Sequence, residues 1–234
     1  MENDQFSEFD FSETTSDSPI NRREFLGIAG SGIFLFFTIG NASAFAQELP
    51  GRWPPRSLPT DFNAYIKIGD NGRVACYTGK IEMGQGVNTS LSQMLADELD
   101  VSIDVVDVVM GDTDLCPWDM GSLGSMTTRF FGLALRSAAA EARRVLMELA
   151  SEHLKTHTEN LATENGVVVD KTNRQHRVTY AQFAKGRKIE RHLAEKPTVK
   201  KPSEFKIMSK PVLRKDAQAS GCGRTCLVKN QSEI

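Results

Sequence analysis

The chain has 234 residues, of which 28 are basic and 30 acidic, so its formal net charge at pH 7 is −2. This balance excludes binding to nucleic acid by bulk positive charge. The length holds one or two domains and excludes a large multidomain enzyme. With 40% apolar and 8% aromatic residues, the composition supports a folded core and excludes a membrane protein of many spans.

Residues 1–46 have the composition of an export leader. The pair Arg22-Arg23 precedes an apolar run at 27–39, and Ala44-Phe45-Ala46 supplies a cleavage site with small residues. These features predict a signal of the twin-arginine type, removed on export to the periplasm, which leaves no stable membrane span. The alternative is a membrane anchor formed by an uncleaved signal, although the run of about thirteen residues is short for a bilayer that needs roughly twenty.

Folded structure is expected to begin at residue 61. The preceding segment, 47–60, carries four prolines and predicts an extended linker. Apolar residues then alternate between Ala64 and Ile68, a turn with two glycines follows at 69–72, and 73–78 returns as a second strand. This pattern predicts a β-hairpin.

Two segments then repeat the order of strand, loop and helix. The loop 79–86 leads into a helix with Asn88 or Thr89 as its cap and its last apolar residue at Leu99. The β-branched run 105–110 predicts a buried strand, and the loop 115–128 leads into a long helix from about 129 to 154. Further on, the sequence predicts a hairpin from 166–170 and 177–180, followed by a short helix at 181–186.

Both loops combine small residues with a helix start, where free amides and the helix dipole attract anions. In the first loop, Gln85 stands between Gly84 and Gly86 and offers a polar ligand both a donor and an acceptor. In the second loop, the residues that suit a phosphate are Ser122, Gly124, Ser125 and Thr127. The alternative is that both loops are tight turns with nothing bound. Neither is a P-loop, because no Lys follows the last glycine.

Other polar residues fit structural roles better. His153 and His157 are four apart without a third ligand, so they are expected to be solvated. Cys222 and Cys226 have no second pair and are expected to bind no metal. Glu82 is either an acid or base beside the first loop or, by default, a solvated carboxylate. The arginines expected on the solvated or subunit-facing side of the long helix are Arg136, Arg143 and Arg144.

Four motifs carry a family resemblance. They are Gly-Lys-Ile-Glu-Met-Gly-Gln-Gly-Val-Asn-Thr at 79–89, Ala-Asp-Glu-Leu-Asp at 96–100, Val-Met-Gly-Asp-Thr-Asp at 109–114 and Gly-Ser-Leu-Gly-Ser at 121–125. They resemble the molybdopterin-binding large subunit of the xanthine dehydrogenase and aldehyde oxidase family, in the branch of isoquinoline 1-oxidoreductase beta subunits. The resemblance covers about 62–217, and its Met-Gly-Gln-Gly motif is specific.

The resemblance implies a division of work between the loops. Gly84, Gln85 and Gly86 match the loop that approaches the pterin and the metal. Ser122, Gly124, Ser125 and Thr127 match the loop that holds the pterin phosphate. The implied cofactor is molybdopterin cytosine dinucleotide with molybdenum, and the implied partner is a small subunit with [2Fe-2S] iron–sulfur clusters. The intact enzyme of this kind oxidises small heteroaromatic rings or aldehydes using water.

The sequence also departs from that family. Its large subunits are several times longer than this chain, and the glutamate that acts as their base lies near their C-terminus. We therefore expect a truncated N-terminal part that is inactive alone, with no catalytic residue and no metal ligand of its own. The expected fold is α+β, with short antiparallel strands packed on two main helices in a partial molybdenum-cofactor-binding domain at 61–195.

The remaining segment, 196–234, is expected to be an extended, truncated stretch before a missing hammerhead domain. Its lysine and proline content does not indicate nucleic-acid binding, since no aromatic residues are interleaved with the basic ones. The rival hypothesis for the whole chain is a non-catalytic binding or assembly module for an iron–sulfur partner subunit.

Overall fold

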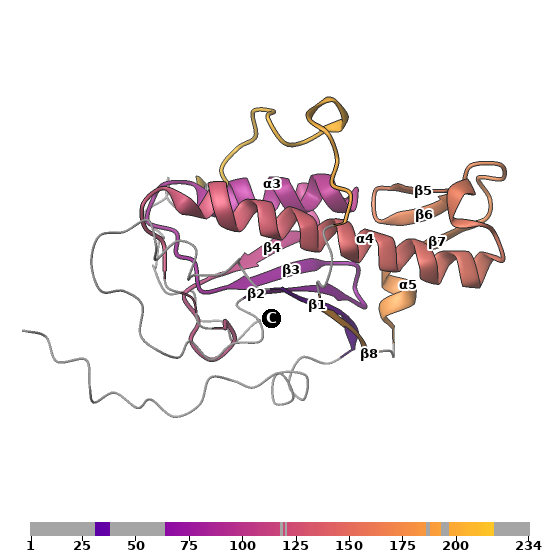
Figure 1. The fold of residues 1–234 in the computed structure, drawn as a ribbon, viewed down its shortest axis with the longest axis horizontal. Coiled ribbons are helices and arrows are strands. Elements are labelled where there is room, and N and C mark those ends of the chain that lie inside the picture. The colour runs from indigo at the N-terminus through magenta and orange to yellow at the C-terminus, as the bar shows by residue number, and fades with distance from the viewer. Residues whose placement is uncertain are drawn as a thin grey trace, which may run out of the picture.

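The computed structural model describes residues 31–37, 64–117, 119, 121–185, 188–192 and 197–217. A five-stranded sheet forms one layer, and two helices, α3 (Val87–Leu99) and α4 (Gly132–Leu154), cover one of its faces (Figure 1). A small three-stranded sheet lies near the C-terminal end of α4. The expected α+β class is confirmed. Among the described residues, no helix combines the length and the apolar character needed to cross a membrane.

The predicted hairpin forms the middle of the larger sheet. Strands β2 (Ala64–Gly69) and β3 (Val74–Thr78) pair antiparallel, with Ile66 opposite Cys76. Gly72 has a φ of 78°, which its missing side chain permits, and its amide donates to the carbonyl of Gly69 at 3.0 Å. The alternation of apolar residues therefore predicts this element correctly.

Two pairs of strands are parallel rather than antiparallel. The chain passes from the end of β3 through a loop into α3. It then returns through the short 3-10 helix Ile103–Val105 to the start of β4 (Val106–Val109). A crossover of this kind places the second strand beside the first in the same direction. The strand order is β4-β3-β2-β1-β8, in which β8 (Lys188–His192) also pairs parallel with β1.

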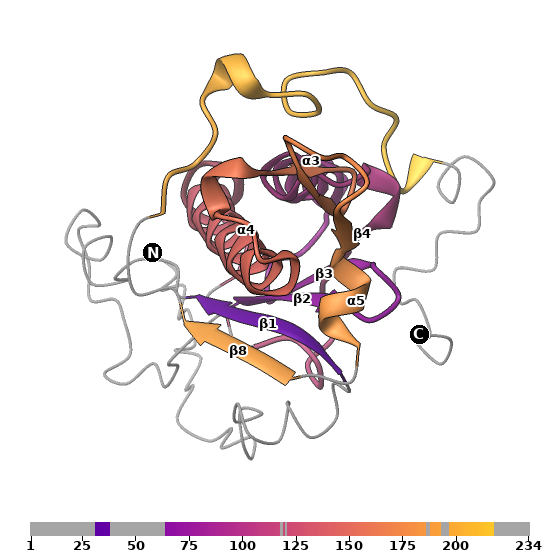
Figure 2. The same cartoon turned by 90° about the vertical axis from the view of Figure 1, so that its right-hand side faces the viewer.

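Strand β1 (Gly32–Phe37) comes from the apolar run that the sequence predicts as the core of an export leader. It lies between β2 and β8 (Figure 2), and all six residues are buried. Ile33, Leu35 and Phe37 join the main core under the helices. Arg22-Arg23 and the predicted cleavage site lie outside the described residues.

The two long helices pack closely because small residues lie between them. Ala138, Ala139 and Ala142 of α4 are buried in the same core as Leu91 and Leu95 of α3. The first residue of α4, Gly132, allows this approach, because a Cβ there would lie 2.8 Å from the sulfur of Met94. A π-helical turn, Thr127–Phe131, precedes α4, so the helical segment begins slightly before the predicted position.

The smaller sheet contains the second predicted hairpin. Strands β6 (Val167–Asp170) and β7 (Arg177–Thr179) pair antiparallel, and β5 (Leu161–Glu164), which follows the 3-10 helix Thr158–Asn160, adds a strand that the sequence pattern does not predict. Helix α5 (Tyr180–Ala184) begins at a capping box on Thr179. The Tyr180 hydroxyl donates to the Leu99 carbonyl at 2.7 Å and so connects this sheet to the end of α3.

Residues 197–217, here named the C-terminal arm, run over α3 and include the 3-10 helix Pro202–Glu204 (Figure 1). The buried carboxylate of Asp97 binds the arm by its main chain. It accepts the amides of Lys206 and Ile207, each at 3.1 Å, and of Met208 at 2.8 Å. These contacts join segments that lie far apart in the sequence.

The expectation for the helix arginines is wrong for two of them. Arg136 and Arg143 have side chains only 15% and 17% exposed, and they approach the fully buried carboxylate of Glu98 at 2.7 and 3.8 Å. A buried carboxylate without a partner would be costly, so these cations are drawn inward. Arg144 does lie on the exposed side, where it pairs with Glu141 and Glu148.

Candidate functional site

The two loops singled out in the sequence leave the same edge of the large sheet. The first loop, 79–86, follows β3, and the second, 110–126, follows β4. Because β3 and β4 are parallel neighbours, their carboxyl ends meet at one edge, which is where open α/β sheets place ligands. The topology therefore brings the predicted segments together.

Direct contacts join the loops. The hydroxyl of Ser122 accepts the amide of Ile81 at 2.8 Å and donates to its carbonyl at 3.3 Å. The ammonium of Lys80 donates to the carbonyl of Gly121 at 2.8 Å and pairs with Asp119 at 2.6 Å. Both side chains of this ion pair are buried, 9% and 2% exposed. No motif in the sequence predicts this pair, and only the lysine within a glycine-rich loop hints at it.

Glu82 neutralises the start of α3 from within the chain. Its carboxylate accepts the amides of Gly84 at 2.9 Å, Gly86 at 2.8 Å and Asn88 at 2.9 Å. Gly84 and Gly86 adopt φ values of 96° and 81°, which turn their amides toward one point. Glu82 is therefore not a simple solvated carboxylate. The amides predicted to bind an anionic ligand already bind the carboxylate of Glu82.

Gln85 also turns inward. Its side-chain nitrogen donates to the carbonyl of Ile81 at 2.9 Å, and its oxygen accepts the amide of Met83. Both halves of the amide thus stabilise the loop instead of facing a ligand. The space beside the Cα of Gly84 stays open, because a Cβ there would meet no atom within 4 Å.

A buried acceptor near the first loop has no partner. The side-chain oxygen Oδ1 of Asn88, in the first turn of α3, has no hydrogen bond among the described residues. Such an atom is costly unless a donor from elsewhere reaches it. This position therefore suits a ligand that carries N–H groups.

The second loop leaves two hydroxyl groups without a partner among the described residues. Gly124 and Ser125 have φ values of 59° and 56°, so the chain makes a tight left-handed bend before the helix. Within the described part of the chain, the hydroxyls of Ser125 and Thr127 have no hydrogen-bond partner. The amides at the start of the π-helical turn also precede the first bond inside the helix. Of the residues predicted for a phosphate, Ser122 is used between the loops, and Ser125 and Thr127 are available.

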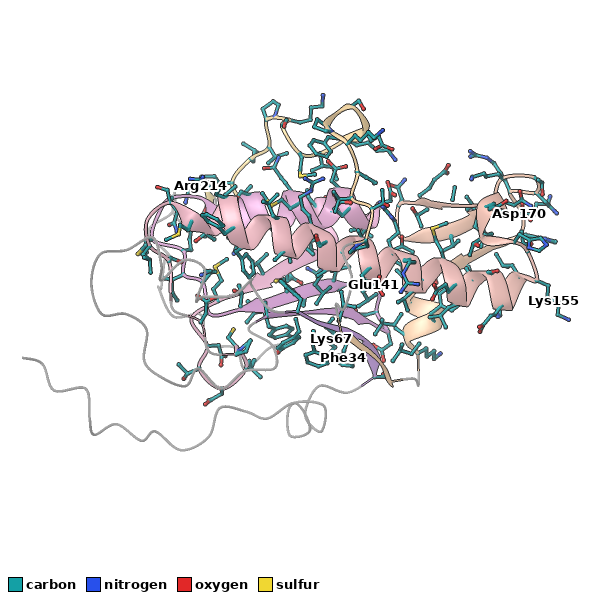
Figure 3. The ribbon with its side chains drawn as sticks, viewed as in Figure 1. Phe34, Lys67, Glu141, Lys155, Asp170 and Arg214 are labelled. Atoms are coloured by element: carbon teal, nitrogen blue, oxygen red, sulfur yellow. The ribbon has the colours of Figure 1, made fainter. Side chains whose placement is uncertain are left out.

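Arg214 from the C-terminal arm reaches the first loop, at the end of the molecule where α3 begins (Figure 3). Its guanidinium donates to the carbonyl of Gly84 at 2.7 Å, pairs with Asp216 at 2.6 Å and lies 3.8 Å from Glu82. The hydrogen bonds from Arg214 hold the pKa of Asp216 below its usual value. No pattern in the sequence indicates this contact across the length of the domain.

Both loops carry exposed apolar side chains. Exposed apolar clusters mark ligand or partner sites when they gather in one place. The exposed large apolar residues of the loops and of the following helix start are Ile81, Met83, Leu123, Phe130 and Leu133.

The other candidates do not form a site among the described residues. No group of three or more His, Cys, Asp or Glu side chains there could hold a metal ion. His153 packs edge-on against Phe183, and Cys222 and Cys226 lie outside the described residues. Burial raises the pKa of the Cys116 thiol to about 11, so it stays protonated at neutral pH.

Known proteins match this chain over the segment that contains both loops. A nicotinate dehydrogenase subunit from Pseudomonas putida is 30% identical over 164 residues, which is 70% of this chain and 14% of that protein. The beta subunit of isoquinoline 1-oxidoreductase from Brevundimonas diminuta is 28% identical over 70% of this chain and 22% of its own length. The match to a solved structure of CO dehydrogenase from Oligotropha carboxidovorans covers 52% of this chain and 15% of the CO dehydrogenase chain, with 28% identity and a TM-score of 0.47.

The chain thus spans between about a seventh and a fifth of the length of these relatives. The predicted resemblance to the molybdenum-binding subunits of this family is confirmed by the sequence matches. The family described as the molybdopterin cofactor-binding domain matches residues 12–220, nearly the whole sequence. On this match, the chain belongs to the family of molybdopterin cofactor-binding domains.

Proposed function

We propose that this chain binds part of the molybdenum cofactor, as the N-terminal portion of a molybdenum hydroxylase large subunit. The observation that carries the proposal is the contact of Ser122 with Ile81, which joins the two loops at one sheet edge while the hydroxyls of Ser125 and Thr127 stay free of every described residue. When bound, the cofactor supplies the redox chemistry that oxidises a heteroaromatic ring or an aldehyde with water.

The occupied and the free hydrogen-bond donors divide the cofactor between the loops. The carboxylate of Glu82 already fills the amide site at α3 and repels a second anion. The phosphate therefore binds at the second loop, to the hydroxyls of Ser125 and Thr127 and the open amides of the π-helical turn. The uncharged pterin, which carries N–H donors, suits the open space beside the Cα of Gly84 and the unpartnered oxygen of Asn88.

The finer assignments belong to the same proposal. The cofactor form is molybdopterin cytosine dinucleotide, the partner is a small subunit with [2Fe-2S] clusters, and the substrate of the intact enzyme is a small heteroaromatic ring or an aldehyde. Relatives named for nicotinate and isoquinoline, each of them one subunit of an enzyme, support a heteroaromatic substrate and a partner subunit. We further propose export to the periplasm, on the leader composition of residues 1–46.

Cofactor analysis tests the proposal. The chain is purified from a bacterium that makes the cytosine dinucleotide cofactor, and molybdenum and released CMP are measured per chain. We expect partial occupancy by molybdenum and CMP, and we expect this occupancy to fall in a variant that lacks the Ser125 and Thr127 hydroxyls. Absence of both molybdenum and CMP from the folded chain contradicts cofactor binding.

The second candidate function is a non-catalytic assembly module. The exposed apolar side chains around the loops favour it, because they suit contact with another protein. Co-purification separates the two functions. An iron–sulfur partner without molybdenum or CMP supports the assembly module.

A further inference from the structure

The residues of β1 have two roles, one in the predicted leader and one in the folded sheet. The apolar run of the predicted leader and the strand between β2 and β8 are the same residues. An export signal works as an exposed apolar segment. In the folded sheet, these residues are buried on every side that the described structure shows.

The pairing of β1 with β2 is complete. All six residues are in antiparallel register, from Gly32 opposite Gly69 to Phe37 opposite Ala64. Among the described strands of the larger sheet, β8 pairs with β1 alone. Without β1, β2 becomes an edge strand with open amides and carbonyls, and β8 loses its neighbour.

The side chains of β1 fit the core. Ile33, Leu35 and Phe37 are at most 2% exposed and pack in the same cluster as α4. The ring of Phe37 lies 5.9 Å, between centroids, from the ring of Phe131. Phe131 also lies under the ammonium of Lys80, so β1 supports the base of the two loops.

The opposite face of β1 is aromatic. Phe34 lies beside Lys67 on the side of the sheet away from α4 (Figure 3). The ring of Phe36 lies 5.7 Å from that of Tyr65. Both are fully buried, so both faces of the strand contribute apolar burial.

We propose that the edge of β2 and the adjoining core under α4 form an acceptor slot for the chain's own residues Gly32–Phe37. Docking in this slot retains the leader on the folded protein. Docking of β1 and exposure of the export signal are then mutually exclusive states of one segment, so the proposed export requires a chain in which β1 is undocked. The inference concerns the leader only and stands apart from cofactor binding.

The first test uses the full chain with a protease recognition sequence inserted in segment 47–60. The folded protein is cut there and passed over a size-exclusion column. We expect the leader fragment to stay with residues 61–234 and to separate only in urea. Release of the leader fragment from the cut, still folded protein without denaturant overturns the proposal.

Matched variants locate the slot. Leu35→Asp introduces a charge at a core position of β1 that is 1% exposed, and the leader fragment should then separate after cutting. Leu133→Asp makes the same change at a position that is 60% exposed, and the fragment should stay bound. Retention in the Leu35→Asp variant as complete as in the parent contradicts a slot at β1.

Hydrogen exchange keeps the proposal testable if Leu35→Asp folds poorly. In the uncut parent, amides of β2 should be as protected as those of β3, because both strands have neighbours on both sides. Rapid exchange of β2 with slow exchange of β3 overturns the docking of β1.

Mass spectrometry of folded protein from an exporting host supplies the last readout. A folded population that begins entirely after Ala46 also overturns retention of the leader.

Discussion

The carboxylate of Glu82 accepts the backbone amide of Gly86 at 2.8 Å, at the residue that caps α3. The same group binds two further amides, so the chain supplies its own anion to this helix start. The two loops therefore differ in the use of their hydrogen-bond donors. The amides of the first loop bind its own carboxylate, whereas the hydroxyls of Ser125 and Thr127 in the second have no partner among the described residues.

Replacing Glu82 tests this internal anion. Glu82→Gln removes the charge that strengthens three hydrogen bonds, so the free energy of unfolding should fall by about 1.5–3 kcal/mol. Urea denaturation measures the change. Glu152→Gln, at an exposed position of α4, is the matched control and should leave stability unchanged. Equal stability of both variants and the parent would show that Glu82 does not hold the loop.

The open loop gives a prediction for cofactor retention. Ser125→Ala combined with Thr127→Ala should weaken retention by about 1.5–3 kcal/mol for each hydroxyl, the value of a hydrogen bond to a charged group. Molybdenum and CMP per chain are measured after gel filtration. Thr158→Ala removes an exposed hydroxyl elsewhere and should have no effect. The phosphate site is wrong if the double variant retains as much cofactor as the control.

Asp97 gives a prediction for the C-terminal arm. Asp97→Asn places an amide NH₂ donor among backbone amides that need an acceptor, so the arm should detach more often. We expect trypsin to cleave after Lys206 at least several-fold faster, since local opening sets the rate. Asp114→Asn, in an exposed loop, serves as the control. Unchanged cleavage after Lys206 would contradict a hold on the arm by Asp97.

The lowered pKa of Asp100 predicts that the protein loses stability in acid. Burial acts to raise its pKa, but hydrogen bonds from Lys200, Thr163 and Lys206 outweigh burial and lower the pKa below its usual value. Because the folded state holds this proton less tightly, the stabilisation is present above the usual carboxyl pKa. It is lost as the pH falls through the lowered value.

Urea unfolding between pH 7 and pH 2.5 measures this dependence. Asp100→Asn should lower stability at pH 7 and flatten the acid part of the curve. Asp114→Asn should keep the slope of the parent. An unchanged slope in Asp100→Asn would assign the acid sensitivity to other carboxylates.

Local patterns predict the elements that local forces determine. The alternation around Ile66 and the turn glycines specify the first hairpin, and the helix faces of α3 and α4 follow from their apolar spacing. The likeness of the two loops also follows from the sequence order of strand, loop and helix, whereas their shared edge requires the parallel pairing of β3 and β4, which the expectation of antiparallel strands misses. These features depend on residues that are near one another in the chain.

The remaining features depend on distant partners. An apolar run such as 32–37 has the same composition in a leader and in a buried strand, so only the open edge of β2 decides its use. The position of Arg136 in the helix sequence predicts a solvated side chain, but in the structure the side chain turns inward to pair with the buried Glu98. Glu82 contacts amides of its own loop, but two left-handed glycines must first orient them.

The hold of Asp97 on the C-terminal arm uses no side chain of the arm. Three successive peptide groups, at 206, 207 and 208, supply the donors. Any residue with a backbone N–H can therefore stand at these positions, and proline alone is barred from all three. Asp97 thus fixes the main chain of the arm at 206–208, and the arm's own side chains serve other contacts, such as the ion pair of Lys206 with Asp100 and the burial of Met208.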